Sequence, residues 1–416
     1  MPFNSSARGS FGPQGKKVIK GPLAPVWTTF SPGAVGTSAF SYTFVATDDS
    51  GDAPTYSVAS GALPTGLTLD STTGVLSGTA TVSGTYTYTL RATDVNGRAT
   101  DTTSISQVVT LAAPPGGDLY QTAGTYTWTC PTGVTSVNVV AIGGGGSGAV
   151  GNTGNAGAAG GLGWKNNITV VPGTGYTVVV GGGGAGRQYG CQEGNSGGQS
   201  YFISAATVAG NGGQSGGQSN DSGCGSCRQA SGGGYVGDGG GNGGNGGYEC
   251  NNVSGPGGGG AGGYTGAGGS GSTSNNGSGQ SGSGGGGGAG GNGGGGTCYD
   301  GGGGGGVGVY GAGSSGSGSG NGGTGGFGGQ GGSGGGNGEN AGTSCYSFSG
   351  GGGAYGGGGG GTNDGQSEPT NPRSRAGGRG AVRIIWGPSR AFPSTNVGLN
   401  YGVGTIAGAT NETTRA

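Results

Sequence analysis

The stretch TYTWTCPTGVTSVNVVAIGGGG (125–146) runs from β-branched and aromatic residues straight into glycine. Two further blocks, NNITVV (166–171) and YTVVVGGGG (176–184), have the same strand-forming character, and the second also ends in glycine. Near the other end of the chain, GGRGAVRIIWG (377–387) passes from glycine back into a β-branched run. Because β-branched and aromatic residues favour strands, we predict a β frame that holds both ends of a long glycine tract.

The composition excludes many functions. Glycine supplies 126 of the 416 residues, and histidine is absent. Hydrophobic residues make up 29% and charged residues 7%, against about 45–50% and about 25% in ordinary globular domains. Without histidine, the chain can have neither His-based acid–base catalysis nor His metal ligands. We identify no nucleophile–base pair and no phosphate-binding loop, so we expect a non-enzymatic protein that uses no cofactor.

The glycine tract, at about 182–376, admits several structures. Collagen requires glycine at every third position, and runs such as 301–306 break that period. A flexible linker is the main alternative, because Gly/Ser-rich chains normally behave as random coils. A repeat argues against a linker: Cys250, Cys298 and Cys345 are 48 and 47 residues apart, and each precedes a glycine run and then a tyrosine.

This layout predicts packed polyproline-II-type (polyglycine II) helices. Such helices have three residues per turn and no internal hydrogen bonds, so neighbouring backbones would have to satisfy their polar groups. One helix up and one down per repeat would place Cys/Tyr loops at one end and the Ser/Asn loops 272–283 and 314–323 at the other. The repeat tyrosines are Tyr264, Tyr310 and Tyr355.

Residues 25–112 have a different character, because short runs alternate apolar and polar side chains between turn signals. In the run 84–90, Tyr86, Tyr88 and Leu90 fall on one face and threonines on the other. Such alternation predicts half-buried strands, and several of them in this length describe a small Ig-like β-sandwich. The predicted strands are 38–46, 54–59, 67–70, 74–78, 84–92 and 103–111.

The predicted fold class is therefore all-β, with an Ig-like β-sandwich followed by a β-framed glycine-rich domain of packed helices. The predicted parts are a basic N-terminal docking tail at 1–24, the sandwich at 25–112, a linker at 113–117, the glycine-rich domain at 118–387 with its β frame at 118–184 and 377–387, and a C-terminal tail at 388–416.

The net charge of −1 is unevenly distributed. Residues 1–24 carry four basic residues and no acid, and residues 370–416 carry six arginines against Glu412 alone. This asymmetry indicates that the ends meet a different partner from the middle; two solvated tails are the alternative. A dense basic patch with interleaved aromatics is absent, so we expect no nucleic-acid partner. Without a long apolar run or an apolar N-terminal region, we expect neither membrane insertion nor a secretory signal.

The chain has seven cysteines, an odd count. Cys224 and Cys227 have the CxxC spacing that serves zinc, redox chemistry or a local disulfide. Zinc would need two further ligands, such as Cys191 and Cys250, and no βαβ context supports redox catalysis. We favour disulfides between neighbouring loops, with isolated free thiols as the alternative. The disulfide candidates are Cys191, Cys224, Cys227, Cys250, Cys298 and Cys345.

Aromatic residues gather beside these cysteines, as Tyr299 does beside Cys298 and Tyr346 beside Cys345. Aromatic side chains anchor contacts on recognition surfaces, and arginines would add contacts to anionic surface sugars. The alternative is that the rings shield the loop backbone and pack between glycine helices. The predicted receptor-binding residues are Arg187, Tyr189, Arg228, Tyr248, Tyr299, Tyr346 and Phe348.

Two acidic turns, at 48–52 and 94–101, have the composition of calcium loops. They lack EF-hand spacing, and Asp and Asn are common in turns without a metal. We predict no metal site, and the sequence leaves calcium binding open. The oxygen donors concerned are Asp48, Asp49, Asp52, Asp94, Asn96 and Asp101.

Most of 25–112 resembles the Putative Ig (cadherin-like) repeat of surface and phage proteins. The resemblance implies a spacer or presentation module. The Cys pair of immunoglobulins is missing, because the first cysteine of the chain is Cys130. The blocks that carry the resemblance are LPTGLTLD (63–70), GVLSGT (74–79), GTYTY (84–88) and RATD (91–94).

The glycine-rich part is similar to the glycine-rich domain of phages in three blocks, 125–146, 170–184 and 377–386. Related glycine-helix sandwiches tip the long tail fibres of some T-even-type phages, where distal loops bind bacterial surface receptors. The termini, at 1–21 and 390–396, resemble those of marine cyanophage virion proteins. The resemblance implies a virion protein that is assembled in the host cytosol and exposed outside the cell.

Taken together, these features lead us to expect a virion fibre or appendage protein that attaches to a host-cell surface. Its partners would be other virion proteins, through the basic termini, and a host surface glycan or protein, with self-association open. A purely structural role is the alternative, either in capsid decoration or in a fibre, with loops that contact other copies. A polysaccharide depolymerase would need paired carboxylates in a cleft, and acids are sparse in the glycine tract.

Overall fold

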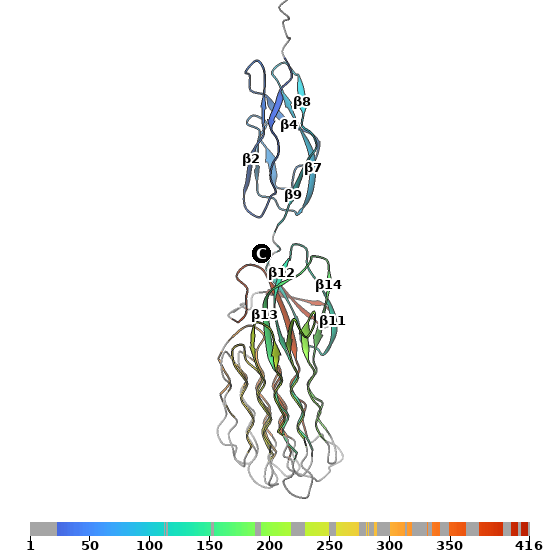
Figure 1. The fold of residues 1–416 in the computed structure, drawn as a ribbon, viewed down its shortest axis with the longest axis vertical. Helices are drawn as coiled ribbons and strands as arrows, with labels where there is room; N and C mark the ends of the chain where they lie inside the picture. Colours follow the sequence, from blue (N-terminus) through green and yellow to red (C-terminus); the bar gives the residue numbers. More distant parts are fainter. Residues whose placement is uncertain are drawn as a thin grey trace, which may run out of the picture. The chain divides into compact units, whose positions relative to one another are not determined.

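The computed structural model divides the chain into two compact units, Met1–Ala112 and Ala113–Ala416. No helix occurs among the residues that it describes, and every sheet is antiparallel (Figure 1). It describes residues 23–111, 113, 115–150, 154–187, 193–217, 229–248, 255–273, 280, 282, 287–288, 300–312, 314–317, 331, 335–341, 349–362 and 374–393, and the backbone of 401–406 and 409–414.

The first unit is a β-sandwich of short strands. Strand β7 pairs with β4, β8 and β9, strands β2, β6 and β5 form a second sheet, and β1 pairs with β3. The strands are β1 (Val26–Thr29), β2 (Phe40–Thr43), β3 (Val45–Thr47), β4 (Thr55–Gly61), β5 (Leu67–Leu69), β6 (Val75–Gly78), β7 (Gly84–Thr93), β8 (Ala99–Asp101) and β9 (Ile105–Val109).

Strand β7 confirms the predicted alternation. Tyr88 and Leu90 are buried and Tyr86 is half-buried, whereas Thr87, between the two tyrosines, and Arg91, after Leu90, are exposed. The buried face packs into a core that takes residues from both main sheets, including Phe44, Leu76, Ile105 and Val109. Each predicted strand is present, with 38–46 divided into β2 and β3, while β1 and β8 were not predicted.

The second unit contains two larger sheets. One has seven strands in the order β18-β13-β12-β19-β10-β21-β20, and the other has five in the order β11-β14-β15-β16-β17. The strands are β10 (Gly116–Tyr120), β11 (Gly124–Thr129), β12 (Ser136–Ile142), β13 (Leu162–Thr169), β14 (Gly175–Val180), β15 (Ser200–Phe202), β16 (Val208–Gly210), β17 (Tyr235–Val236), β18 (Gly239–Gly241), β19 (Ala381–Trp386), β20 (Tyr401–Ile406) and β21 (Ala409–Thr414).

The centre of the seven-stranded sheet is buried on both faces, and β19 is buried at every position. One face meets the five-stranded sheet, where Trp128 packs against Trp386 and Phe202 with ring centroids 5.9 and 5.7 Å apart. The other face carries a second apolar cluster that includes Ile142 and Tyr264. Burial on both faces explains why these central strands read as continuous apolar runs.

The structure corrects both predicted borders of the glycine-rich domain. Residues 116 and 117 of the predicted linker 113–117 belong to β10, which pairs with β19 along its whole length. The predicted C-terminal tail 388–416 also contributes to the sheet, because β20 and β21 form a hairpin and β21 pairs with β10. The prediction of a linker rested on the glycines at 116 and 117. In the sheet, glycine at 116 leaves room for a neighbouring side chain, because a Cβ there would lie 2.5 Å from an atom of the Trp386 ring.

Glycine segments extend from the strand ends and lie side by side (Figure 1). We call the end joined to the strands the sheet end and the opposite one the far end. The described glycine segments are 143–150, 154–161, 181–187, 193–199, 210–217, 229–234, 241–248, 255–263, 267–273, 300–307, 335–341, 349–354, 356–362 and 374–380.

Backbone hydrogen bonds between these segments recur every three residues. The N–H groups of Gly143 and Gly146 donate to the segment 154–161, and those of Gly144 and Ser147 donate to the segment 193–199. Their N···O distances are 2.8–2.9 Å. Each segment is therefore held by several neighbours rather than by bonds within itself.

The predicted arrangement of one segment up and one down per repeat is wrong. Gly247 donates to Gly257, and Gly257 donates to Ser272, which places the start of the Ser/Asn loop 272–283 level with residues at the far end. Tyr264 lies instead at the sheet end, in the cluster with Ile142. The chain thus crosses the array three times between Gly241 and Thr273, in the segments 241–248, 255–263 and 267–273. One repeat therefore spans more than one pair of segments.

The close approach of the segments depends on glycine. A Cβ added to Gly304 would lie 1.8 Å from the carbonyl oxygen of Gly259, and one added to Gly184 would lie 1.8 Å from that of Asn195. No side chain fits at such positions, so the array has backbone bonding where an ordinary domain has an apolar core.

Candidate functional site

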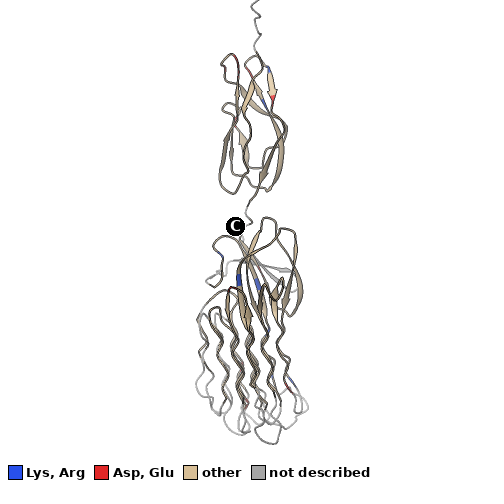
Figure 2. Cartoon of the chain, in the orientation of Figure 1, with Lys and Arg blue, Asp and Glu red and all other residues tan. Residues whose placement is uncertain are grey.

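The far end of the array is where the described parts of several glycine segments stop. Figure 2 shows that the described parts of the segments carry few charged side chains, so the segments themselves are largely neutral. Most of the residues predicted to bind a receptor lie in the sequence between these segments. Tyr189, Arg228, Tyr299, Tyr346 and Phe348 lie outside the described residues, as do the six disulfide candidates Cys191, Cys224, Cys227, Cys250, Cys298 and Cys345.

Arg187 is the first predicted binding residue that the structure places. It is half-buried at the end of the segment 181–187, and its guanidinium donates to the carbonyl of Glu193 at 3.2 Å and to the Asn195 side chain at 2.8 Å. Its backbone N–H donates to the Ser374 hydroxyl at 2.8 Å. Arg187 therefore joins two neighbouring segments, and its guanidinium already has acceptors within the chain.

Tyr248 is the second predicted binding residue that the structure places. It is half-buried and ends the described part of the segment 241–248, at the far end of the array. Its neighbour Gly247 donates to Gly257 at 2.8 Å, so the segment is held by its neighbour up to this point. The residues after Tyr248 lie outside the described part of the chain, and its role in receptor binding stays a prediction.

The repeat tyrosines have a structural role at the sheet end that the sequence analysis missed. Tyr264 is fully buried; its hydroxyl donates to the Gly308 carbonyl at 3.0 Å and accepts from the Gly311 N–H at 3.1 Å. Its ring stacks on Phe392 with centroids 5.9 Å apart. Burial raises the pKa of this phenol well above its usual range, so Tyr264 stays neutral. Its two hydrogen bonds, to Gly308 and Gly311, hold the backbone on either side of Val309.

The other two repeat tyrosines meet arginines from the C-terminal part of the chain. The Arg383 guanidinium lies 4.6 Å from the centre of the Tyr310 ring and donates to the Val309 carbonyl at 3.3 Å. The Arg379 guanidinium lies 5.5 Å from the centre of the Tyr355 ring. Since Arg383 is fully buried and Arg390 is 7% exposed, these two arginines are not available to dock the C-terminal region on another protein.

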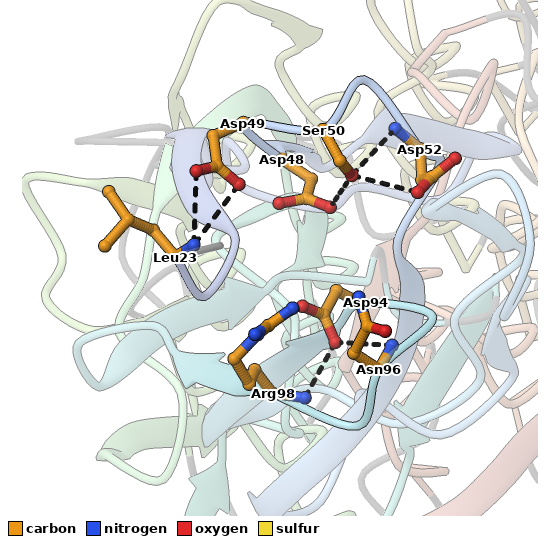
Figure 3. A network of polar contacts seen from close by, with 8 residues as sticks. All are labelled: Leu23, Asp48, Asp49, Ser50, Asp52, Asp94, Asn96 and Arg98. Atoms are coloured by element: carbon orange, nitrogen blue, oxygen red, sulfur yellow. Dashed lines mark hydrogen bonds and ion pairs between the residues drawn. The ribbon is translucent and has the colours of Figure 1, made fainter. Parts of the chain in front are cut away.

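The acidic turns of the first unit use their carboxylates in hydrogen bonds and ion pairs within the chain (Figure 3). Asp94 accepts from the N–H groups of Asn96 and Arg98 at 2.8 and 2.7 Å and pairs with the Arg98 guanidinium at 2.8 Å. Burial raises the pKa of Asp94, and these hydrogen bonds lower it by more, so the net direction is downward. In the other turn, the Ser50 hydroxyl bridges Asp48 and Asp52.

The remaining acid of the second turn, Asp101, forms an exposed ion pair with Arg91 at 2.7 Å. Within the part of the chain that the structure describes, no three acidic or thiol side chains lie together as a metal site would require. The described residues likewise contain no helix that is long and apolar enough to cross a membrane.

Cys130, which we did not count among the disulfide candidates, is buried and free. Its thiol lies 3.2 Å from the Val134 carbonyl oxygen, within the turn after β11. Burial raises the pKa of the thiol, which makes it a poor nucleophile. Cys130 is therefore a packing residue of the core.

A hollow of about 210 Å³ lies on the array, between three glycine segments. No pattern in the sequence indicates this hollow, because its walls come from segments whose alignment only the folded chain defines. It is lined by Glu193, Ser196, Gln214, Ser215, Gly217, Gln229 and Ala230.

Comparison with protein families gives two matches in this chain. Residues 23–110 match the family described as Putative Ig domain, and residues 121–334 match the family described as Glycine-rich domain. The second match covers more than half of the chain, so the protein belongs to the Glycine-rich domain family. A search among curated proteins gave no match.

Proposed function

We propose that this is a non-enzymatic virion fibre or appendage protein that displays loops for attachment to a host-cell surface. The observation that carries the proposal is the layout of the glycine-rich unit: a β frame holds the described glycine segments at one end, and backbone hydrogen bonds join these segments to one another toward the opposite end. Loops on a rigid scaffold are the usual place for binding residues. The Ig-like unit would act as a spacer.

We further infer that the segments are polyglycine II helices. A helix with three residues per turn directs every third N–H to the same neighbour, and the bonds of Gly143 and Gly146 to one segment and of Gly144 and Ser147 to another have this period. Such an array is stiff because its backbone groups are paired between segments. Stiffness would let the far-end loops keep their positions while their sequences differ.

The basic N-terminal tail 1–24 would dock the protein on the particle, because it carries four basic residues and no acid. On this proposal the protein is a component of the virion, assembled in the host cytosol and exposed outside the cell. The alternative is a purely structural subunit whose far-end loops contact other copies, and the two roles differ in whether the loops are free.

A cell-binding assay tests the attachment proposal. Purified, fluorescently labelled full-length chain is mixed with marine cyanobacterial cells, and the bound fraction is measured after washing. We expect saturable binding that falls at least about tenfold when Tyr299, Tyr346 and Phe348 are all changed to Ser, because aromatic anchors dominate recognition surfaces. The matched control is Tyr235→Ser, since Tyr235 is 39% exposed on β17 at the sheet end.

Equal loss of binding in the control would show a non-specific effect of removing tyrosines. Wild-type binding that does not saturate, or that the triple variant leaves unchanged, would contradict attachment through these loops. In that case, self-association of the chain measured by analytical ultracentrifugation would favour the structural alternative.

A further inference from the structure

We propose that the hollow between the segments 193–199, 210–217 and 229–234 binds one neutral sugar unit, an inference that rests on the proposed attachment function and names the ligand class. The hollow measures about 210 Å³, below the about 300–1,000 Å³ typical of sites for drug-sized ligands. Its size therefore suits a single small ring, or one residue of a longer glycan that continues into solvent.

The lining offers hydrogen-bonding groups that are not used inside the chain. The Glu193 carboxylate and the Gln229 amide make no side-chain hydrogen bond to the described residues, and both residues are exposed. The Gln214 side-chain oxygen accepts from the Ser231 N–H at 3.2 Å, which leaves its amide NH₂ to donate. Amides and carboxylates that accept and donate around one space are suited to the hydroxyl groups of a sugar.

The two serines of the lining add hydroxyl groups. The Ser196 hydroxyl oxygen accepts from the Ser215 N–H at 3.1 Å, so its hydrogen remains free to donate to a ligand. Ser215 contributes a second hydroxyl from the neighbouring segment. Each hydroxyl can donate one hydrogen bond and accept others.

The hollow is held open by the backbone of the array. Gly194 donates to Gly216 at 3.1 Å and Gly197 donates to Gly213 at 2.9 Å, which fixes the first segment on the second. Ala230 is 3% exposed, and its carbonyl accepts from Gly246 at 3.0 Å, which fixes the third. A preformed site loses little conformational entropy when a ligand binds.

The charge of the lining favours a neutral ligand. Among the described residues that line the hollow, Glu193 is the one ionisable residue, and a carboxylate repels an anionic sugar while it accepts hydrogen bonds from hydroxyl groups. The nearby Arg187 guanidinium directs two of its N–H groups at the Glu193 carbonyl and the Asn195 side chain, and Arg187 is not among the described residues that line the hollow. This differs from our expectation from the sequence that arginines would bind anionic sugars.

The test is titration of the full-length chain with methyl glycosides of glucose, galactose and mannose, and with N-acetylneuraminic acid, followed by saturation-transfer NMR. We expect at least one neutral glycoside to bind with a dissociation constant below about 10 mM. Gln229→Ala and Glu193→Gln should each weaken it about tenfold, the loss expected from one hydrogen bond to a charged or amide group. Asn242→Ala is the control, because Asn242 is exposed on the array and outside the hollow.

The inference is overturned if no neutral glycoside binds below about 10 mM, if the anionic sugar binds more tightly, or if Asn242→Ala weakens binding as much as Gln229→Ala. Calorimetry of each variant checks that the fold is intact. The cell-binding assay separates this inference from the attachment proposal: cell binding without glycoside binding refutes the hollow alone, and glycoside binding without cell binding refutes attachment alone.

Discussion

Replacement of Gly304 by Ala should strongly destabilise the glycine-rich unit, although it adds a single methyl group. Gly304 is buried in the array, and the new Cβ would lie 1.8 Å from the carbonyl oxygen of Gly259 and 2.3 Å from its carbonyl carbon. Real Cβ contacts are not shorter than 3.0 Å. The two segments must therefore separate by at least about 1.2 Å at this point.

The magnitude follows from the hydrogen bonds that this separation would break. Gly258 donates to Gly302 and Ala261 donates to Gly305, both at 2.9 Å, and these bonds join the same two segments. Lengthening to about 4 Å exceeds hydrogen-bond reach. Each lost bond leaves buried backbone groups unpaired at a cost of about 1–3 kcal/mol, so the two bonds together cost about 2–6 kcal/mol. After about 0.4–1 kcal/mol gained from a stiffer unfolded chain, we expect a net loss of about 3 kcal/mol.

Gly234→Ala is the matched control. A Cβ on Gly234 would meet nothing closer than the Asn211 side-chain amide at 3.5 Å, an ordinary contact. Differential scanning calorimetry of the full chain gives the melting temperature of the glycine-rich unit. We expect Gly304→Ala to lower it by about 5–10 °C and Gly234→Ala to change it by less than about 2 °C. Equal effects of the two substitutions, or a Gly304→Ala protein as stable as the wild type, would refute the packing described for the array.

Three further predictions concern the two β-sheet cores. Burial raises the pKa of Tyr88 to about 12 from an unfolded value of about 10. The stability contributed by its neutral form is therefore present below pH 10 and lost as the pH rises toward 12. Chemical denaturation of the first unit should show that its free energy of unfolding falls by about 1.4 kcal/mol per pH unit in this range, a fall that Tyr88→Phe should lack. Trp128→Phe should destabilise the second unit by about 2–4 kcal/mol, measured by the same method, because the indole N–H donates to Asp118 at 2.8 Å; an unchanged stability would contradict this. Cys130 should resist iodoacetamide in the native protein and react after unfolding, as peptide mapping by mass spectrometry would show; rapid native labelling would contradict its burial.

Strands whose side chains carry a clear pattern could be predicted from the sequence. Strand β19 was predicted with its observed limits, Ala381–Trp386, because its β-branched run has no competing interpretation. Strand β7 followed from the alternation of Tyr88 and Leu90 with polar neighbours. In both cases the side chains themselves determine which face is buried.

Many of the elements that we missed contain glycine or are very short. Strand β10 begins Gly116-Gly117 and was taken for a linker, and its pairing depends on the bulky Trp386 opposite. Strands β15–β18 have two or three residues each within glycine-rich sequence. Their pairing is set by neighbouring strands, so no local pattern reveals it. The hollow was unpredictable for the same reason, because three distant segments meet there.

The candidate site was predicted in part. Of the residues predicted from the sequence to bind a receptor, the structure describes Arg187, which is bonded to Glu193 and Asn195, and Tyr248, which is half-buried; their role in binding stays a prediction. The sequence did not identify Tyr264 as a core residue, because a tyrosine that follows a glycine run has the same local context in a loop and in a core. Its burial results from Phe392, which lies far away in the sequence.

The measurement that tests the central claim most directly is a cryo-EM reconstruction of the intact particle that carries this chain. The account predicts resolved glycine segments that extend from the β frame, with the far-end loops around Tyr299, Tyr346 and Phe348 exposed to solvent at a distal tip. Burial of these loops against a neighbouring copy would contradict host attachment and support a structural subunit, and glycine segments without ordered density would contradict the array itself.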